Sequence, residues 1–354
     1  MTSGPLDDVT GTRVLHVVQK FSSGVGSAIA QYTRSLPEVE HHLLSGTPVD
    51  GEGDLAEQAD FASTAEMTGS HRAKVRRVRE VVRALRPDVV HAHSSHGGGY
   101  ARLAVARTRH RIVYTPHCYA FERRDVAAPV RGAFWLAEAL LAVNTSAFAA
   151  CSPREQELSA WPTHRAPRYL VPNIAPAVVP VRAEREPGDL LVVGGGRLSA
   201  QKDPDFFLRF VGLLRTRLPR LRAVWLGDGD PTARAALEAG GVAVSGWLPR
   251  AEALPALAAA DLYLHSALWE GFPLMVAEAT ALGVPTLVRR LPSFADVPSE
   301  LTLTGADDVA GALACLTDVP AAKANVSRWS AHLAGNTEAD QRAALVAVYA
   351  GSPR

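Results

Sequence analysis

Short apolar runs alternate with helical patterns along the first half of the chain. The apolar runs lie near 13–18, 88–95, 111–117 and 140–152, and segments with the periodicity of amphipathic helices separate the first three of these runs. A glycine-bearing turn, "QKFSSGVGS", leads from the first apolar run into the first helical pattern. Strands that alternate with helices in this way predict βαβ units and a parallel sheet.

A stretch rich in proline and charge then interrupts the alternation. Residues 171–189, "VPNIAPAVVPVRAEREPGD", show neither helical nor strand periodicity, which is typical of an interdomain linker. The alternation begins again after this stretch and continues to about residue 290. We therefore predict two Rossmann-like, doubly wound α/β domains that face a central cleft.

The same pattern sets the predicted boundaries. The last helical segment is amphipathic, so it needs a partner surface and is a candidate to pack across the cleft. The predicted division is a flexible leader at 1–12, a first domain at 13–176, a linker at 177–188, a second domain at 189–335, and a C-terminal helix within 336–354 that crosses back to the first domain.

Composition narrows the class of protein. The chain has 354 residues, is 47% hydrophobic and carries a formal net charge of +1, so it lacks the basic character of a nucleic-acid-binding protein. Its three cysteines are far apart and form no CxxC pair, which fits a reducing cytoplasm better than a disulfide framework. The first residues contain two acids and no apolar core, and no run of 18 apolar residues occurs, so we expect a cytoplasmic protein.

Two glutamates and a Gly-Phe-Pro turn mark the segment "SALWEGFPLMVAEATALG" at 266–283. Pro273 suits the first turn of a helix, so Glu270 and the backbone of 271–273 would lie at a helix N-terminus. Free N–H groups and the helix dipole bind phosphate at such a position. Glu278 would lie a turn and a half inside the helix, within reach of a ribose diol. The alternative is a surface glutamate and a capping glutamate.

A second candidate site is "GGGRLSAQKDPD", where Arg197 and Lys202 follow a glycine run at the end of a predicted strand. Ligands of open α/β sheets collect at that edge. Two cations there could neutralise a departing diphosphate, the arginine as a bidentate fork and the lysine as a point charge. The alternative is an ordinary turn with solvated basic residues. If the site is catalytic, substitution of either cation should reduce turnover far more than stability.

Histidines supply the candidates in the first half. His117, in "YTPHCYAF", follows a strand and could donate to a sugar hydroxyl or assist at the reacting centre, although a lone histidine is often structural. The stretch "HAHSSH" superficially resembles a metal cluster, with His91 and His93 on one strand face and His96 beyond them. Because no carboxylate or cysteine completes a ligand set, we predict no metal site, and we expect His93 and Ser94 to be loop residues that line the cleft.

The glycine loop "SSGVGS" lacks the spacing of a dinucleotide fingerprint, and no acidic residue ends a clear second strand. Close approach of a ligand to the backbone at Gly24 and Gly26 is the remaining function of this loop.

The basic helix predicted at 71–86 has two interpretations. Its valine stripe most simply faces the core while its arginines are solvated, and the alternative is weak docking on an anionic membrane, which would place the protein at the inner face of that membrane.

Taken together, these motifs resemble the family-four group of retaining glycosyltransferases with the GT-B fold. The resemblance covers nearly the whole chain after residue 12. "EGFPLMVAE" looks like the E-x7-E signature of that family, and "GGGRLSAQKDP" resembles its arginine and lysine diphosphate motif. "DVVHAHSS", "IVYTPH", "VPNIAP" and "ADLYLHSALWEGFP" follow in the matching order. The first loop departs from the usual adjacent glycine pair, and Asp203 stands where a glycine often follows the lysine.

The resemblance implies a role for each matching position. The catalytic residues would be His117, Arg197, Lys202 and Glu270, with the cations stabilising the leaving diphosphate and His117 orienting the donor sugar. The donor would be bound by Gly196, Gly227, Gly229, Gly246, Trp247, Leu248, Gly271, Phe272, Pro273, Leu274 and Glu278. The acceptor side would comprise Gly24, Val25, Gly26, His93 and Ser94.

The function implied is metal-independent transfer of a hexosyl or N-acetylhexosaminyl group with retention. The donor would be a nucleotide diphosphate sugar, with UDP favoured over GDP, and no cofactor is expected. The acceptor would be a hydroxyl of a glycolipid, a polysaccharide precursor or a natural product, and the composition is typical of a high-GC bacterium. The alternatives are a sugar-nucleotide epimerase on a similar fold, which would need further acid/base carboxylates, and a non-catalytic sugar-nucleotide-binding subunit.

Overall fold

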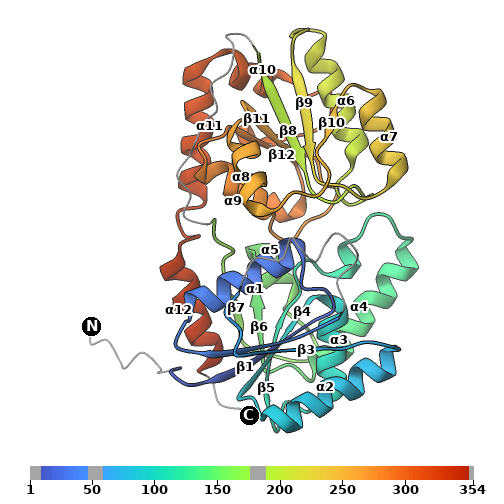
Figure 1. Cartoon of the computed structure of the whole chain (residues 1–354), viewed down its shortest axis with the longest axis vertical. Coiled ribbons are helices and arrows are strands. Elements are labelled where there is room, and N and C mark those ends of the chain that lie inside the picture. Colours follow the sequence, from blue (N-terminus) through green and yellow to red (C-terminus); the bar gives the residue numbers. More distant parts are fainter. Residues whose placement is uncertain (1–8, 47–58, 176–188, 351–354) are drawn as a thin grey trace. The chain divides into compact units, whose positions relative to one another are not determined.

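A computed structural model of the chain describes residues 9–46, 59–175 and 189–350 and divides into two units (Figure 1). The first unit comprises residues 1–174 and 336–354, and the second comprises residues 175–335. The predicted linker at 177–188 lies outside the described residues. Each unit is described by itself below.

The first unit contains a seven-stranded, fully parallel sheet in the order β3-β2-β1-β4-β5-β6-β7. The order reverses between β1 and β4, as in other doubly wound folds. The strands are β1 (Arg13–Val18), β2 (Glu40–Ser45), β3 (Ser63–Glu66), β4 (Val89–His93), β5 (Arg111–Thr115), β6 (Ala147–Ala150) and β7 (Arg168–Leu170).

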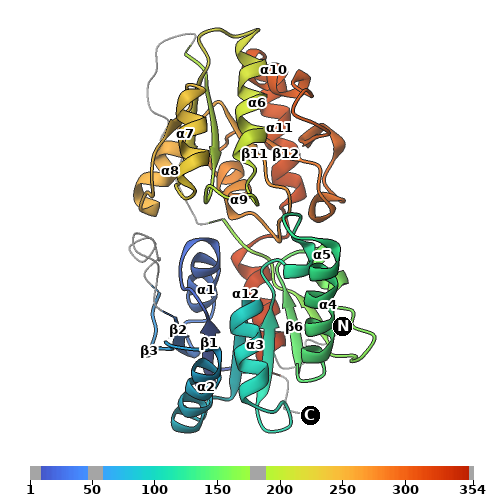
Figure 2. The same ribbon diagram turned by 90° about the vertical axis from the view of Figure 1, so that its right-hand side faces the viewer.

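Helices cover both faces of this sheet (Figure 2). Leu15 and Val17 of β1 pack with α2, α3 and α4 on one face, whereas Val14 packs with α1 and α12 on the other, because successive side chains of a strand alternate. The helices are α1 (Ser23–Ser35), α2 (His71–Leu85), α3 (Ser94–Ala104), α4 (Ala128–Ala142), α5 (Pro153–Leu158) and α12 (Glu338–Tyr349), with a 3-10 turn η2 (Ala120–Glu122).

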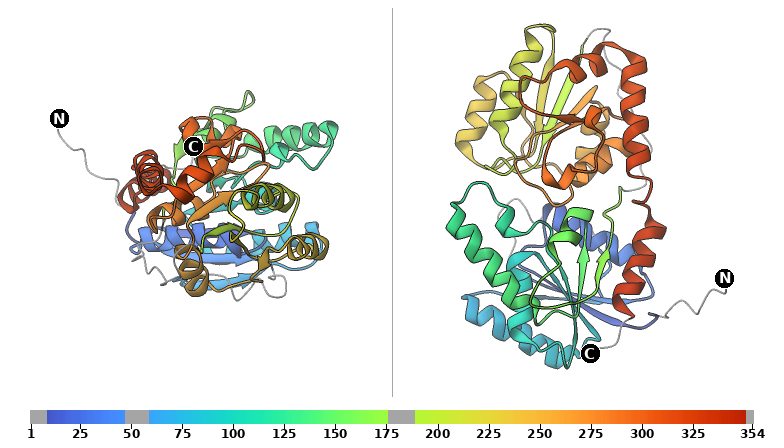
Figure 3. Two further views of the ribbon diagram at one scale, coloured as in Figure 1. Left: turned by 90° about the horizontal axis from the view of Figure 1, so that it is seen from above. Right: turned by 180° about the vertical axis from the view of Figure 1, so that it is seen from behind.

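The second unit contains a six-stranded parallel sheet in the order β10-β9-β8-β11-β12-β13. In chain order this is 3-2-1-4-5-6, the Rossmann order, with its reversal between β8 and β11. Helices lie on both sides of this sheet (Figure 3). The strands are β8 (Leu191–Gly195), β9 (Arg222–Leu226), β10 (Ala243–Val244), β11 (Leu262–His265), β12 (Thr286–Arg289) and β13 (Thr302–Leu303).

Two apolar cores pack the helices of the second unit against its sheet. Val192 belongs to the core with α6, α7 and α10, and Val193 belongs to the core with α8, α9 and α11. The helices are α6 (Pro204–Arg215), α7 (Pro231–Ala239), α8 (Arg250–Ala258), α9 (Leu274–Ala281), α10 (Ala310–Thr317) and α11 (Val319–His332), with 3-10 turns η3 (Pro292–Phe294) and η4 (Ser299–Leu301). Among the described residues of both units, no helix is long and apolar enough to cross a membrane.

Some local predictions need correction. The predicted leader is wrong for residues 9–12, because Val9 is 3% exposed and packs with β1, α1 and α12, and Glu40 N donates to Thr12 O at 2.9 Å. Residues 1–8 lie outside the described residues. Strand β10 has only two residues, since the chain turns away at Gly246 with a φ of +72°.

Candidate active site

The loops after β8 and β11 lie side by side at the carboxyl edge of the second sheet, where its strand order reverses. Leu268 N donates to Gln201 O at 2.8 Å, and Ser266 Oγ donates to Lys202 O at 2.6 Å. These bonds bring Lys202 against Glu270, although the two residues are 68 positions apart. Ligands of open α/β sheets bind at this kind of crevice.

Lys202 and Glu270 form an ion pair in which both side chains are largely buried, at 20% and 11% exposure. His265 Nε2 lies 3.5 Å from the same carboxylate oxygen, and His265 Nδ1 lies 3.1 Å from Tyr263 Oη. Burial raises the pKa of Glu270, but the charge of Lys202 and the hydrogen bond with His265 outweigh it and lower the pKa to about 2. The glutamate therefore stays ionised at neutral pH and holds the ammonium group at the sheet edge.

Glycines allow the strand-end loops to approach Lys202 and each other. A Cβ at Gly196, whose φ is +116°, would lie 2.9 Å from Lys202 Cε. A Cβ at Gly227, whose φ is +132°, would lie 2.4 Å from Gly196 O. Gly227 also pairs with Gly246 in an isolated bridge, and Gly229 pairs with Leu198 in another, so the predicted donor glycines form one connected group.

Helix α9 begins close to the end of β8, since a Cβ at Gly195 would lie 2.6 Å from Met275 Cε. Pro273 is the N-cap residue, so Gly271, Phe272 and Pro273 precede the helix as the sequence predicts and Leu274 is its first residue. Glu278 is 8% exposed and pairs with Arg250 Nη2 of α8 at 2.8 Å. The pair joins α9 to the segment that carries Trp247 and Leu248, which are partly buried, and Arg197 is exposed beside the glycines.

The departure at Asp203 has a structural explanation. Its φ is +46°, a left-handed conformation that glycine adopts without strain and that aspartate tolerates better than most residues. The Asp203 carboxylate caps α6 by accepting from Phe206 N at 3.2 Å, and it accepts from Arg289 Nη1 at 2.6 Å. The aspartate therefore takes the backbone conformation of the usual glycine and adds a cap and an ion pair.

In the first unit, the acceptor-side candidates gather at the corresponding edge, between β1 and β4. The predicted glycine loop is wrong in detail, because α1 begins at Ser23 and Gly24, Val25 and Gly26 form its first turn. Gly26 is buried and its N donates to Ser22 O at 3.1 Å. The helix start thus brings backbone, rather than a bulky side chain, to the edge of the sheet.

His93 and Ser94 are not loop residues. His93 ends β4 and is fully buried, and Ser94 begins α3 with a φ of +58°. His117 is half-buried just past β5, with a φ of +51°. Of the three, Ser94 and His117 keep partial exposure, so His93 reaches a ligand only through another residue.

Sequence reasoning weighed His91, His93 and His96 as a metal cluster and missed the group of histidines that the structure brings together. His16, His91 and His93 each place a ring nitrogen within 4.8 Å of the others, whereas His96 stacks on His71 instead. Both nitrogens of each member already take part in hydrogen bonds: those of His91 with Tyr349 and Thr115, and those of His16 and His93 with other histidines. A metal ion would have to displace these bonds.

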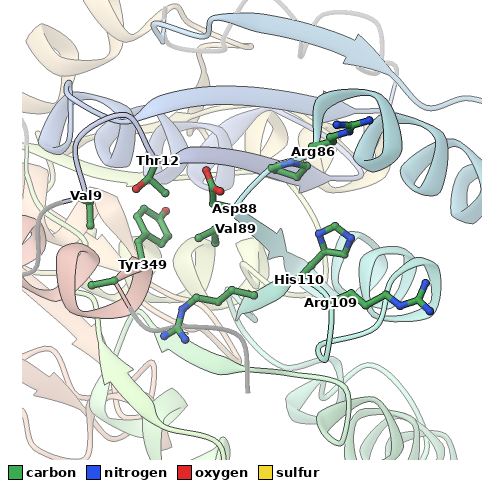
Figure 4. Close-up of a pocket in the computed structure, with 11 residues that line it drawn as sticks. Val9, Thr12, Arg86, Asp88, Val89, Arg109, His110 and Tyr349 are labelled. Atoms are coloured by element: carbon green, nitrogen blue, oxygen red, sulfur yellow. The ribbon is translucent and has the colours of Figure 1, made fainter.

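A cavity of about 440 Å³ lies at the opposite, amino edge of the first sheet (Figure 4). Its lining is basic, with one acid, and contains none of the predicted site residues. The polar lining residues include Arg86, Asp88, Arg109, His110 and Arg111. The candidate active site is therefore separate from this cavity.

Two Rossmann-order sheets, with glycine turns and a paired lysine and glutamate at the strand-order reversal, are the architecture of the GT-B class of glycosyltransferases. The chain belongs to the glycosyltransferase family-four group: residues 23–174 match the glycosyl transferase 4-like domain, and residues 187–332 match the glycosyl transferases group 1 domain. An uncharacterized 41.2 kDa protein in the cps region of Klebsiella pneumoniae is 24% identical over 309 residues, which cover 82% of this chain and 84% of that protein.

Solved structures share the fold at low sequence identity. Sucrose-phosphate synthase from Thermosynechococcus elongatus has a TM-score of 0.72 and 16% identity, covering 96% of each chain. HepE from Anabaena, in complex with UDP and glucose, has a TM-score of 0.72 and 15% identity, covering 95% of this chain and 98% of that one. A candidate UDP-N-acetylglucosamine 2-epimerase from Listeria monocytogenes has a TM-score of 0.64 and 16% identity, covering 95% and 94%.

Proposed function

We propose that this glycosyltransferase moves a hexosyl or N-acetylhexosaminyl group from a UDP-sugar to an acceptor hydroxyl with retention of configuration. The observation that carries the proposal is the Lys202–Glu270 pair among the glycines at the sheet reversal. A fixed ammonium group at that edge suits a leaving diphosphate, whose negative charge grows as the glycosidic bond breaks. The bound UDP of HepE supports UDP over GDP as the nucleotide.

The proposed mechanism assigns the charge of the transition state to this site. Arg197 and Lys202 stabilise the departing diphosphate, while the N-terminus of α9 contributes N–H groups after Gly271. Glu278 holds the ribose hydroxyls and Glu270 holds the donor sugar. The oxocarbenium-like sugar is then attacked by the acceptor on the face that the diphosphate leaves, which retains configuration without an enzymic nucleophile.

The two alternatives can be weighed against the comparisons. The candidate epimerase shares the fold, but both units of this chain match glycosyltransferase domain models. A non-catalytic binding subunit would not need a buried lysine and glutamate with a strongly lowered carboxyl pKa at the sugar end of the site. Both observations favour the transferase.

A thermal-shift panel with UDP, GDP, ADP and TDP tests the nucleotide. A ligand at 100 times its Kd stabilises the native state by about 2.7 kcal/mol, so UDP should raise the melting temperature and GDP should raise it less. UDP release from UDP-sugars, with acceptor sugars and lipid-linked sugars present, tests transfer. NMR of the product linkage then reports its anomeric configuration, and inversion would contradict the mechanism.

We also propose that neither a metal ion nor a cofactor takes part. Activity should survive EDTA followed by exchange into metal-free buffer, because Arg197 and Lys202 carry the positive charge that a metal would supply. Loss of activity that Mg²⁺ or Mn²⁺ restores would overturn this part of the proposal while leaving the transferase assignment intact.

Membrane contact at the inner face of the cytoplasmic membrane is a further proposal. The buried residues of α2 are Val78 and Val82, and the helix presents arginines outward, as its core-facing interpretation predicts. Arg79 Nε donates to Ala104 O at 2.9 Å and so joins α2 to the end of α3. Large apolar side chains are exposed on α3 and α4, namely Leu103, Val130, Trp135, Leu136 and Leu140.

Basic and apolar elements together suit an anionic bilayer better than α2 alone. Co-sedimentation should therefore detect weak binding to vesicles that contain phosphatidylglycerol, and the binding should fall with salt and with the L136S/L140S double variant. Equal binding to purely zwitterionic vesicles would contradict the electrostatic part of this proposal.

A further inference from the structure

Three buried histidines and the half-buried His117 form a continuous hydrogen-bonded chain through the first unit. His41 Nε2 lies 3.1 Å from Leu36 O, and His41 Nδ1 lies 3.0 Å from His16 Nε2. His16 Nδ1 lies 3.0 Å from His93 Nε2, and His93 Nδ1 lies 3.1 Å from His117 Nε2. The chain thus runs from a backbone carbonyl to the candidate catalytic histidine.

The sheet register explains why these rings meet. His16 is opposite His91, two residues before His93, and it is opposite Leu43, two residues after His41. His93 is opposite Thr115, and His117 follows two residues later. Each step from β2 to β1, to β4 and past β5 therefore advances two residues, which keeps all four side chains on one face and moves them toward the carboxyl edge.

The carbonyl at one end gives the chain a direction. Leu36 O can only accept, so His41 Nε2 must carry the proton, and in the neutral ring His41 Nδ1 must then accept. The same logic passes along the chain, so that His16, His93 and His117 each donate from Nε2. Because the neutral ring has one N–H, Nδ1 of His117 is left as a bare acceptor.

Burial keeps the rings neutral, which this reasoning requires. Desolvation lowers the pKa of His41 to about 4 and that of His117 to about 3. Desolvation and neighbouring histidines also lower the pKa of His16 and of His93 well below the usual value. Among the described residues, nothing hydrogen-bonds to His117 Nδ1, and this side chain is half-buried at the edge of the sheet.

We propose that His41, His16 and His93 are positioning residues that hold His117 in its Nε2–H tautomer, so that His117 Nδ1 accepts a hydrogen bond from a sugar hydroxyl. The identity of the ligand rests on the proposed function, whereas the tautomer does not. A His117 whose Nδ1 accepts a hydrogen bond requires the sugar to supply the hydrogen of a hydroxyl group, whereas a donating His117 would require only an acceptor atom. A deoxy or fluoro sugar at that hydroxyl has no such hydrogen to offer.

Two-bond ¹H–¹⁵N NMR of the full chain, labelled with [¹⁵N]histidine, measures the tautomer directly at pH 7. Loss of a signal in the His117→Asn variant assigns His117. We expect a protonated Nε2 and an unprotonated Nδ1 in the wild type without any ligand. A His117 protonated on Nδ1 would overturn the proposal, whatever the enzyme transfers. The tautomer itself is measured on the wild-type protein, and the variant serves only to assign the signal.

Removing His41, at the far end of the hydrogen-bonded chain of histidines, tests whether that chain sets the tautomer of His117. In His41→Phe, nothing fixes His16, so His117 should show a mixture of tautomers although its own contact with His93 is intact. His42→Phe is the matched control, because His42 is the next residue of β2 but bonds to Ser63 and takes no part in the chain. An unchanged His117 tautomer in a folded His41→Phe variant would contradict the proposal.

Kinetics then separate this role from a merely structural one. His41→Phe should raise the KM for the donor or acceptor sugar about fivefold, the worth of one ordinary hydrogen bond, while His42→Phe should not. With the deoxy sugar that already lacks the recognised hydroxyl, wild type and His41→Phe should agree. If the tautomer is as expected but no sugar is transferred, the proposed function fails and the histidine assignment holds.

Discussion

Replacing Lys202 with methionine removes the cation beside a buried carboxylate while keeping most of the side-chain volume. Burial raises the pKa of Glu270, but the charge of Lys202 helps to outweigh it, and the pKa is lowered from 4.5 to about 2. Because this pKa is depressed in the folded chain, its stabilising contribution is fully present above pH 4.5. It is lost as the pH falls through about 2.

The size of the effect follows from that shift. A depression of about 2.5 pKa units corresponds to about 3 kcal/mol of stability at pH 7, since one unit is about 1.4 kcal/mol. In Lys202→Met the favourable charge is gone but the burial of Glu270 remains. We therefore expect the variant to be less stable by about 3 kcal/mol at pH 7 and to approach the wild type as the pH falls toward 2.5.

Urea unfolding followed by tryptophan fluorescence measures this difference in the unit concerned. Four of the six tryptophans, at positions 225, 247, 269 and 329, belong to the second unit. The double variant K202M/E270Q removes the stranded charge and should recover part of the loss. A difference between wild type and Lys202→Met that stays constant from pH 7 to pH 3, or a double variant no more stable than the single one, would refute the reasoning.

Three further outcomes follow from other contacts. Arg197→Ala, at an exposed position, should leave the free energy of unfolding within about 0.5 kcal/mol while reducing kcat about 100-fold, and equal loss of both would make the residue structural. Glu138→Ala strands the buried Arg102, 2.8 Å from the missing carboxylate, and should cost about 3–5 kcal/mol in urea unfolding, whereas Glu80→Ala on the exposed face of α2 should cost under about 0.5 kcal/mol. Asp203→Gly should be more stable than Asp203→Ala by about 1 kcal/mol, because only alanine strains the left-handed backbone; thermal unfolding of the two variants checks the order.

The Lys202 prediction also revises an expectation from the sequence. From the motif alone, Arg197 and Lys202 look equivalent, and substitution of either should spare stability. The structure separates them, because Lys202 is buried against Glu270 and Arg197 is exposed. Only Arg197 therefore gives a clean test of catalysis, and Lys202 needs the double variant beside it.

Much of the fold is predictable because local chemistry agrees with it. The runs "RVLHVV" and "LVVGG" are rich in β-branched residues and end at turns. Helix α7 has the sequence signals of a helix start, because Asp230 caps it and Pro231 occupies its first position. Strand β2 was not predicted, since "EHHLLS" is half polar. Its histidines are buried because each bonds to a neighbouring strand, His41 to His16 of β1 and His42 to Ser63 of β3. Helix α4 was missed because its apolar residues point outward as well as inward.

The site divides in the same way. The glycine turns, Lys202 and Glu270 follow strands that the sequence identifies, so their common edge could be foreseen. The histidine chain could not be foreseen, because it depends on the register of four strands and on the start of the loop after β5. The available signal was weak: His91 and His93 alternate along one strand, His16 lies in another apolar run, and His41 lies in the half-polar segment "EHHLLS". Knowing which residues are opposite one another required the paired strands.

Helix α12 makes the second unit an insertion within the first. Leu345, Val348 and Tyr349 of α12 are buried in the core of the first unit, where they pack with β1 and α1. Gln341 Nε2 donates to Pro172 O at 2.8 Å. During synthesis the ribosome completes the whole second unit before it supplies α12. The core between β1, α1 and α12 therefore stays incomplete, with one apolar face of the first sheet exposed, while the second unit folds. The last turn of α12 also brings Tyr349 Oη to His91 Nδ1. The hydrogen bonds around His16, His91 and His93 are therefore among the last of the first unit to be completed.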